Sequence, residues 1–497
     1  MKKRNVFLVA MLGFLGLCFS CNKILLEDPQ SDINPDAFFT TADQCIQATN
    51  GVYSHLPGIF NQTAFWAVTM AGTDLMMFNG GSTTVQAIQD YNFSAATETN
   101  SHAVWKSCYA AIKDANFVLS RVAKAPIADS IKRRLLGESA FLRATYYFIL
   151  SNVFGEVPLW TNELNFDTVA QLGRAPLKEV RSQMITDLKE AADALPLQYD
   201  QSDGGRVTKG AALALLARVY LFNGDWQGAY NAANTVIQSG QYELLPDYAD
   251  LFDPYNKSKN NPESVFEIQY KRDASTNQNF KVNSFYTWFF PLGDSQGGTY
   301  SGVDFGTTLL QSYPEFYPSQ KLVDLYKAQD GRREVVLSWG YNGQKFTSFP
   351  VPDRPWFGPK FWDLTANRTS SEKNLYFIRY ANVLMAFAEA ANELGKPAEA
   401  IAKLNQIEER ADLPDLNGGM TQQQLRNFIQ AERAREFAGE FQRKWDLDRW
   451  GTLVEALQTV KEENTEGSQN VKAFHALFPV PYDEIVKNPN LSQNEGY

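Results

Sequence analysis

Residues 208–239 read TKGAALALLARVYLFNGDWQGAYNAANTVIQS, and this stretch decides the fold class. Residues 208–222 and 226–239 each have the length and the alanine-rich apolar face of an amphipathic helix. Between them, Asn223-Gly224-Asp225 has the composition of a tight turn. The stretch therefore predicts an antiparallel helical hairpin of the tetratricopeptide-like kind, in which small side chains let two helices pack closely.

The same helical periodicity continues on both sides of this hairpin. Before it, the pattern predicts helices at 42–55, 104–122, 130–153 and 177–194; after it, a second hairpin is predicted at 376–394 and 397–411. Residues 241–373 interrupt the pairs with Pro, Gly, Asn and aromatic residues and with short strand-like runs such as 264–270. The sequence thus predicts a mainly α fold of tetratricopeptide-like helical pairs with a loop-rich subdomain that carries short strands.

The first 20 residues are predicted to be a signal peptide. Basic residues at positions 2–4 precede an apolar run at 6–17, which is too short to cross a hydrocarbon core of about 30 Å. Ser20 and Cys21 resemble a loose lipobox, so we expect Cys21 to be lipidated as the first residue of the mature chain. Cys18 is the competing acceptor, disfavoured by the bulky Leu17 before it. The alternative is a secreted protein with an unmodified Cys21.

The predicted organisation has five parts: a signal peptide (1–20), a lipidated N-terminus and tether (21–37), an N-terminal helical part (38–240), a loop-rich aromatic subdomain (241–373), and a C-terminal helical part on the same scaffold (374–497). The net charge of −10 and the pI near 5.1 argue against nucleic acid or an anionic membrane surface as partner. A neutral ligand is therefore expected.

Cysteine and histidine usage predicts no metal site and no cofactor. The three histidines, His55, His102 and His475, are scattered without ligand spacing. Cys45 and Cys108 remain in the mature body. They could form a disulfide in an exported protein, but two buried thiols that pack as small apolar groups are the favoured interpretation.

One charged segment invites a catalytic interpretation. Carboxylates and guanidiniums alternate at helical spacing in Glu432, Arg435, Glu436, Glu440, Arg443, Asp446 and Arg449. A spacing of three residues sets Glu432 beside Arg435, Glu440 beside Arg443 and Asp446 beside Arg449, which predicts surface and interhelix ion pairs instead of acid and base chemistry.

A second segment, GDSQGG at 293–298, resembles a trypsin-type nucleophile loop. It contains an extra Gln296, and no histidine lies in a recognisable partner motif, so a turn is the better interpretation. The chain is therefore predicted not to be an enzyme. The 56 acidic residues still offer many carboxylate pairings, so a tethered hydrolase stays open as an alternative.

Six long segments in a fixed order resemble the SusD/RagB family of outer-membrane nutrient-binding lipoproteins of the Bacteroidetes. They are LLEDPQSDINPDAFFTTADQCIQATNGVY (25–53), GESAFLRATYYFILSNVFGEVPL (137–159), GRVTKGAALALLARVYLFNGDWQGAYNAANTVIQSGQYEL (205–244), FIRYANVLMAFAEAANELGKPAEAIAKLNQIEERA (377–411), IQAERAREFAGEFQRKWDLDRWG (429–451) and LFPVPYDEIVKNPNLSQNEGY (477–497). The match spans nearly the whole mature chain.

The resemblance implies four tetratricopeptide-like units and a lipid anchor in the outer membrane, with the body facing the exterior. It also implies that the protein binds an oligosaccharide and delivers it to a SusC-like TonB-dependent transporter. Some members bind peptides, so a peptide ligand is the first alternative. A tethered glycan hydrolase and a helical-repeat scaffold without a small ligand are less favoured.

Aromatic side chains suit a glycan site, because a flat ring stacks on the apolar face of a sugar while polar neighbours bond its hydroxyls. They crowd one region, as Phe285, Tyr286, Trp288, Phe289, Phe290, Tyr300, Trp339, Tyr341, Trp356, Phe357 and Trp362. Roughly two-thirds are expected to be core. The resemblance adds residues 74–91, which contribute to the ligand face in the family. By residue type and loop context, the candidate ligand-binding residues are Phe78, Asn79, Tyr91, Trp288, Tyr300 and Trp339.

Overall fold

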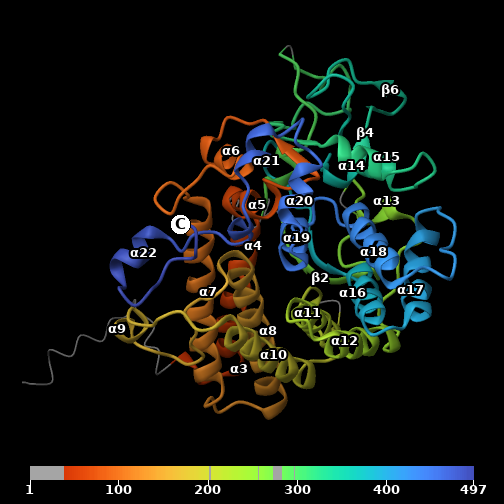
Figure 1. The fold of residues 1–497 in the computed structure, drawn as a ribbon. Coiled ribbons are helices and arrows are strands. Elements are labelled where there is room, and N and C mark those ends of the chain that lie inside the picture. Colours follow the sequence, from red (N-terminus) through yellow and green to blue (C-terminus); the bar gives the residue numbers. More distant parts are fainter. Residues whose placement is uncertain (1–37, 201–202, 256, 272–281, 296) are drawn as a thin grey trace, which may run out of the picture.

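Helices make up most of the computed structural model, and its strands are short (Figure 1). The structure describes residues 38–497 except 201–202, 256, 272–281 and 296. The predicted mainly α fold class is therefore confirmed. The predictions for the signal peptide, the lipidated Cys21 and the tether lie outside the described residues. Among the described residues, no helix combines the length and the hydrophobicity needed to span a membrane.

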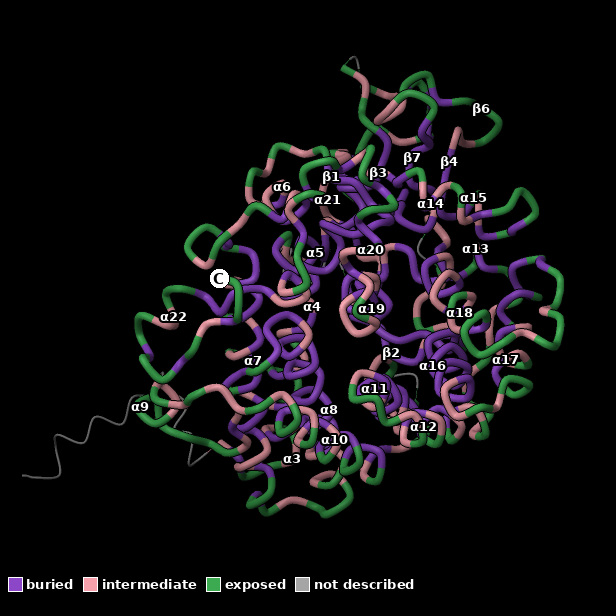
Figure 2. The backbone as a smooth tube through the Cα atoms, in the orientation of Figure 1, coloured by how far each residue is buried: buried purple, intermediate pink, exposed green. Residues whose placement is uncertain are grey.

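The N-terminal part is a stack of helices around one helix that is buried along most of its length. Its elements are α3 (Ala42–Tyr53), α4 (His55–Phe60), α5 (Thr63–Met70), α6 (Thr83–Gln89), α7 (Asn100–Val122), α8 (Asp129–Phe154), α9 (Phe166–Val169), α10 (Leu177–Ala194), α11 (Lys209–Phe222) and α12 (Trp226–Gln238). From Gly137 to Ser151, α8 is buried on all sides (Figure 2). It is the central helix of this part.

Successive helices pack against one another in a curved row that joins the N-terminal helical part to the C-terminal helical part (Figure 1). The row runs from α7 through α8, α10, α11 and α12 to α16 (Tyr380–Glu393) and α17 (Pro397–Arg410). The predicted hairpin is present, and Gly224 in its turn has φ +68, a left-handed conformation that favours glycine. Both predicted helical pairs are thus present, although the first helix of the second pair begins later than predicted.

Most of the remaining helices are short, and they lie mostly in the second half of the chain. They are α13 (Tyr248–Leu251), α14 (Gln320–Leu325), α15 (Arg333–Val336), α18 (Gln422–Glu436), α19 (Arg443–Trp450), α20 (Leu453–Gln458), α21 (Thr465–Asn470) and α22 (Tyr482–Lys487), with 3₁₀ turns η2 (Phe285–Trp288), η3 (Pro359–Phe361) and η4 (Ala473–Ala476). The favoured interpretation of the cysteines also holds, since Cys45 and Cys108 are buried, free thiols.

The described strands pair two by two in antiparallel ladders. The pairs are β1 (Met76–Phe78) with β3 (Phe316–Pro318), β2 (Ser264–Ile268) with β8 (Leu375–Arg379), β4 (Leu337–Ser338) with β7 (Trp356–Phe357), and β5 (Gly340–Tyr341) with β6 (Gln344–Lys345). The helix predicted at 376–394 is wrong at its start, because residues 376–379 belong to β8. There Phe377 and Ile378 are buried against β2, and strand pairing outweighs the helical pattern.

A buried ion network joins the loop-rich part to the C-terminal helices. Arg379, at the end of β8, bonds the carboxylates of Glu263, Glu436 and Glu440, and Glu436 also binds Arg332. All five side chains are nearly or fully enclosed, so each charge depends on its partners.

The same network corrects one predicted pair. Glu440 does not bind Arg443; it binds Arg379 and Lys360, while Arg443 binds Asp74 on the far side of α19. The predicted pairs of Glu432 with Arg435 and of Asp446 with Arg449 are present. Tertiary contacts therefore override helical spacing for one pair of the three.

Candidate functional site

The ladder between β1 and β3 brings together the two regions that the sequence marked for ligand binding. Phe78 lies opposite Phe316 in the register, and the backbone N–H of Asn79 donates to the carbonyl of Glu315 at 2.8 Å. The N–H of Glu315 in turn donates to the carbonyl of Trp288 at 3.1 Å. These two backbone hydrogen bonds thus link residues 78–79, Glu315 and Trp288 into one region, which is partly surface and partly core.

Aromatic rings form a floor beneath the surface of this region. The rings of Phe78 and Trp288 lie 6.4 Å apart, and each packs against Phe316, at 5.4 and 5.6 Å. Behind them, Trp66 of α5 meets Trp288 edge to face at 5.1 Å. Phe78 is 3% exposed and Trp288 8% exposed. Both predicted residues are therefore mainly core, and they support the surface above them.

The residues over this floor are the exposed Asn79 and Tyr313 and the half-buried Gly80 and Glu315, which we call the Asn79–Tyr313 surface. Tyr313 leaves half of its ring in water, and its N–H donates to the carbonyl of Thr287 at 2.8 Å. Asn79 is also exposed. Gly80 leaves room for its neighbour, since an added Cβ would lie 2.7 Å from Cδ of Glu315.

Glu315 is the charged group of this surface. Its Oε2 is shielded from solvent and has no hydrogen-bond partner among the described residues. Burial raises the pKa of its carboxyl above the ordinary value. An unpaired, shielded carboxyl oxygen is costly, and a hydroxyl group that reached it would remove that cost. The surface thus combines one open ring face, one amide and one unsatisfied carboxyl.

Three of the predicted residues lie elsewhere. Tyr91 belongs to a separate small core, where its hydroxyl donates to the carbonyl of Gly72. Tyr300 is 5% exposed, and its hydroxyl donates to the carbonyl of Leu310 at 2.7 Å. Trp339 is half-buried, with the guanidinium of Arg333 over its ring at 4.2 Å. Their hydroxyls and ring faces are already engaged within the protein.

Most of the aromatic cluster predicted at 285–362 is core. Of its eleven rings, all but Trp339 and Tyr341 are buried, which exceeds the expected two-thirds. Sequence reasoning missed Tyr313 and Glu315 because they lie outside the densest runs of rings. The signal that could have found them is Ser312-Tyr-Pro-Glu-Phe-Tyr-Pro318, in which prolines favour an extended segment, so that Tyr313 and Glu315 share the face opposite to Phe316.

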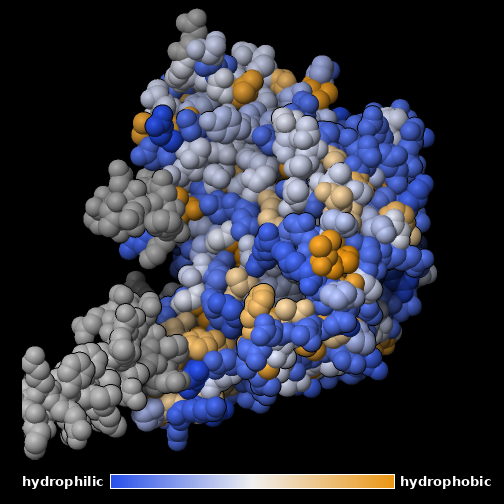
Figure 3. Space-filling model, turned by 90° about the vertical axis from the view of Figure 1, so that its left-hand side faces the viewer, coloured by the Kyte–Doolittle hydropathy of each residue, from blue (hydrophilic) through white to orange (hydrophobic). Residues whose placement is uncertain are grey.

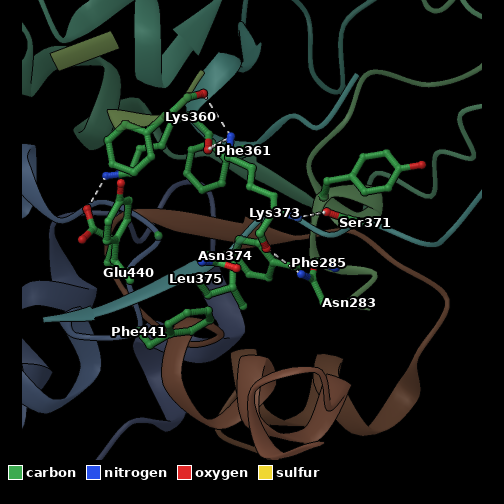
Figure 4. Close-up of a pocket in the computed structure, with 14 residues that line it drawn as sticks. Asn283, Phe285, Lys360, Phe361, Ser371, Lys373, Asn374, Leu375, Glu440 and Phe441 are labelled. Atoms are coloured by element: carbon green, nitrogen blue, oxygen red, sulfur yellow. Dashed lines mark hydrogen bonds and ion pairs between the residues drawn. The ribbon is translucent and has the colours of Figure 1, made fainter. Parts of the chain in front are cut away.

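A small pocket beside β8 contains charged side chains among mainly apolar walls, and it is structural (Figure 4). Its volume of about 40 Å³ holds about three waters at most. Lys360 donates to Glu440 at 2.6 Å, and Lys373 donates to the carbonyl of Trp362 at 2.8 Å. Burial lowers the pKa of both lysines to about 8. These groups hold loops together, and the space is too small for an oligosaccharide.

Models of known protein families match the N-terminal part and the C-terminal part of the chain. Residues 356–497 match the model described as "SusD family", and residues 27–221 match the model described as "Starch-binding associating with outer membrane". SusD-like protein P25 of Formosa agariphila is 28% identical over an alignment that covers 100% of both chains.

Solved structures agree over nearly the whole length. A SusD homolog from Bacteroides thetaiotaomicron superposes with a TM-score of 0.79 at 22% identity, covering 93% of this chain and 98% of the other. A structure titled "Laminarin binding SusD-like protein" gives a TM-score of 0.78 at 25% identity, covering 92% of this chain and 100% of the other. The predicted resemblance is confirmed: the chain belongs to the SusD/RagB family.

Proposed function

We propose that this protein is a surface-exposed lipoprotein that binds oligosaccharides and delivers them to a SusC-like TonB-dependent transporter of the outer membrane. The observation that carries the proposal is the full-length likeness to a laminarin-binding SusD-like protein. The description of the N-terminal family model, which names starch and the outer membrane, points the same way. A net charge of −10 suits a neutral glycan better than an acidic one.

The Asn79–Tyr313 surface is where we place the glycan. The open ring of Tyr313 offers a flat face for the C–H side of a sugar, and the Asn79 amide and the Glu315 carboxyl offer partners for its hydroxyls. Each of these contacts orients a sugar without breaking a bond. The proposed activity is therefore binding without catalysis, and the buried Phe78 and Trp288 act by holding the surface in shape.

The rest of the chain has a supporting part in the proposal. Lipid on Cys21 and the tether at 22–37 keep the body at the membrane, since two or more acyl chains give durable anchoring. The helical parts at 38–240 and 374–497 form the scaffold, and residues 241–373 carry the loops that meet β1. The division is one of function and not of folding, because one large hydrophobic core runs through all three parts.

The test is a titration of purified, non-lipidated chain with laminari-oligosaccharides and malto-oligosaccharides, followed by calorimetry. Saturable binding of either glycan, with the sugar recovered unchanged on chromatography, is the expected result. Shortened oligosaccharides in the eluate would show a hydrolase instead. Binding of a casein digest without binding of either glycan would show a peptide carrier, and no binding at all would favour a scaffold.

A further inference from the structure

A group of apolar side chains stands exposed on one side of the molecule, far from the Asn79–Tyr313 surface along the chain. Leu164 and Phe166, at the start of α9, are 40% and 83% exposed; Tyr482 and Val486, on α22, are 55% and 65% exposed. We call these four residues the α9–α22 patch. Figure 3 shows this side of the molecule, where hydrophobic side chains interrupt a mainly hydrophilic surface.

The two segments lie side by side although about 300 residues separate them (Figure 1). Asn488, just after α22, donates to the carbonyl of Leu172 at 2.8 Å, and Asn490 donates to the carbonyl of Gln171 at the same distance. These bonds fix the loop after α9 against the loop after α22. The patch is therefore a built surface, and its apolar groups are held in place.

A groove of about 450 Å³ runs beneath the patch. Trp105 and Tyr109 of α7, Trp160 and Phe166 are among its walls, and the rings of Tyr109 and Trp160 stack at 5.3 Å with planes 9° apart. Trp105 is 4% exposed and Trp160 9% exposed. The groove thus offers flat apolar walls.

These features fit a polypeptide segment with apolar side chains. A phenyl ring left in water forgoes the stabilisation that burial would give, and apolar patches around a groove are typical of interaction surfaces. A flat bilayer surface would not fill a recessed groove. The charged residues that line the groove are Lys106, Lys487 and Glu484, so its walls do not select a partner by charge.

The position of the patch relative to the start of the described chain indicates which polypeptide. Phe39 packs against Phe117 of α7 at 5.4 Å, and Arg121 of the same helix pairs with Glu163, the residue before Leu164. The described chain therefore starts next to the patch. Sixteen residues, 22–37, separate this place from the predicted lipid and span at most about 55 Å. The patch thus lies on the side that is tethered to the membrane.

We propose that the α9–α22 patch is a docking surface for an apolar, extended segment of the membrane-embedded transporter. The inference rests on the proposed function and adds the contact face. It separates two tasks on one chain: the Asn79–Tyr313 surface takes the glycan, and the α9–α22 patch holds the transporter. A charge in the middle of the patch should then release the transporter and leave glycan binding intact.

The experiment uses the full-length lipoprotein with an affinity tag, expressed in its own host with its transporter. Phe166→Asp is compared with wild type and with Leu197→Asp, the same kind of change at a residue that is 49% exposed and does not line the groove. The amount of the SusC-like transporter, identified by mass spectrometry and normalised to lipoprotein, is the readout. We expect Phe166→Asp to lower it about tenfold, the size of a hot-spot loss, and Leu197→Asp to leave it unchanged.

Equal recovery with Phe166→Asp and wild type would overturn the inference while leaving the proposed function standing. No transporter with the wild-type protein would overturn both. A parallel flotation assay mixes the non-lipidated chain with vesicles of phosphatidylethanolamine and phosphatidylglycerol; flotation that Phe166→Asp abolishes would assign the patch to lipid and overturn the inference. Unchanged glycan binding by Phe166→Asp shows that the variant is folded.

Discussion

Two regions of this molecule differ in how far their aromatic rings are buried. Residues 285–362 contain most of the rings and bury nearly all of them, whereas the α9–α22 patch contains few and exposes Phe166 by 83%. The loop-rich part has short helices and short strands, so side-chain packing must supply the stability that regular elements supply elsewhere. In this protein, a high density of aromatic rings therefore indicates core, and an exposed aromatic ring indicates a functional surface.

The prediction with the largest expected effect concerns the buried ion network around Glu436. Glu436→Gln leaves Arg332, Arg379 and Arg410 without a shared carboxylate, and we expect the free energy of unfolding to fall by about 5 kcal/mol. Urea unfolding measures it. Glu334→Gln is the matched control, since Glu334 makes an exposed pair with Arg333 and should cost less than about 1 kcal/mol. Equal losses would mean that the network is not structural.

The second prediction makes the same change in both aromatic regions. Phe289→Ala removes a fully buried ring that stacks on Phe316 and Phe361, at 5.6 and 4.7 Å, and should cost about 4 kcal/mol of unfolding free energy. Phe166→Ala should change it by less than about 0.5 kcal/mol. Thermal or urea unfolding of both variants decides the matter. A large loss with Phe166→Ala would show that the patch is structural, and the comparison would fail.

The third prediction concerns acid. Burial alone would raise the pKa of Asp74, but Arg443 and Lys321 beside it lower the pKa to about 2. Because the folded value is below the unfolded value of about 3.9, this group stabilises the fold above pH 4, and the stabilisation is lost as the pH falls toward 2. We expect this group to account for a loss of about 2 kcal/mol between pH 5 and pH 2.

Asp74→Asn isolates this contribution. The variant should be less stable than wild type at pH 5, and the difference between the two should shrink as the pH approaches 2. Urea unfolding at several pH values gives both curves. Parallel curves would show that Asp74 has the same pKa in the folded and unfolded states, and the ion pairs with Arg443 and Lys321 would then not govern acid stability.

The sequence predicted the helical pairs well because each has a strong period and marked ends. The helix at 177–194 matches α10 residue for residue, and Gly224 marks the turn between α11 and α12. It missed α5, whose residues are buried on every side and so show no apolar stripe. The sequence analysis also missed that residues 376–379 form part of strand β8 and not of a helix. This strand pairs with β2, more than 100 residues away in the chain, and a local pattern does not show such a contact.

The candidate site was predictable only in part, and for a similar reason. Phe78, Asn79 and Trp288 were candidates by type and context in two separate regions, and the structure places them together, but residue type does not tell whether a ring faces water. That depends on the β1 and β3 ladder, which buries Phe78 and Trp288 and leaves Tyr313 outside. Exposure of a side chain is a property of the packed structure, and no short motif encodes it.

The most direct test of the account is the affinity for laminari-oligosaccharides of Tyr313→Ala against that of Tyr255→Ala, measured by calorimetry. Both tyrosines are about half exposed, at 52% and 47%, and Tyr255 lies outside the Asn79–Tyr313 surface. We predict about a tenfold weaker affinity for Tyr313→Ala, the worth of one stacked ring, and no change for Tyr255→Ala. Wild-type affinity in Tyr313→Ala, with both variants folded, would contradict the assignment of the glycan to this surface.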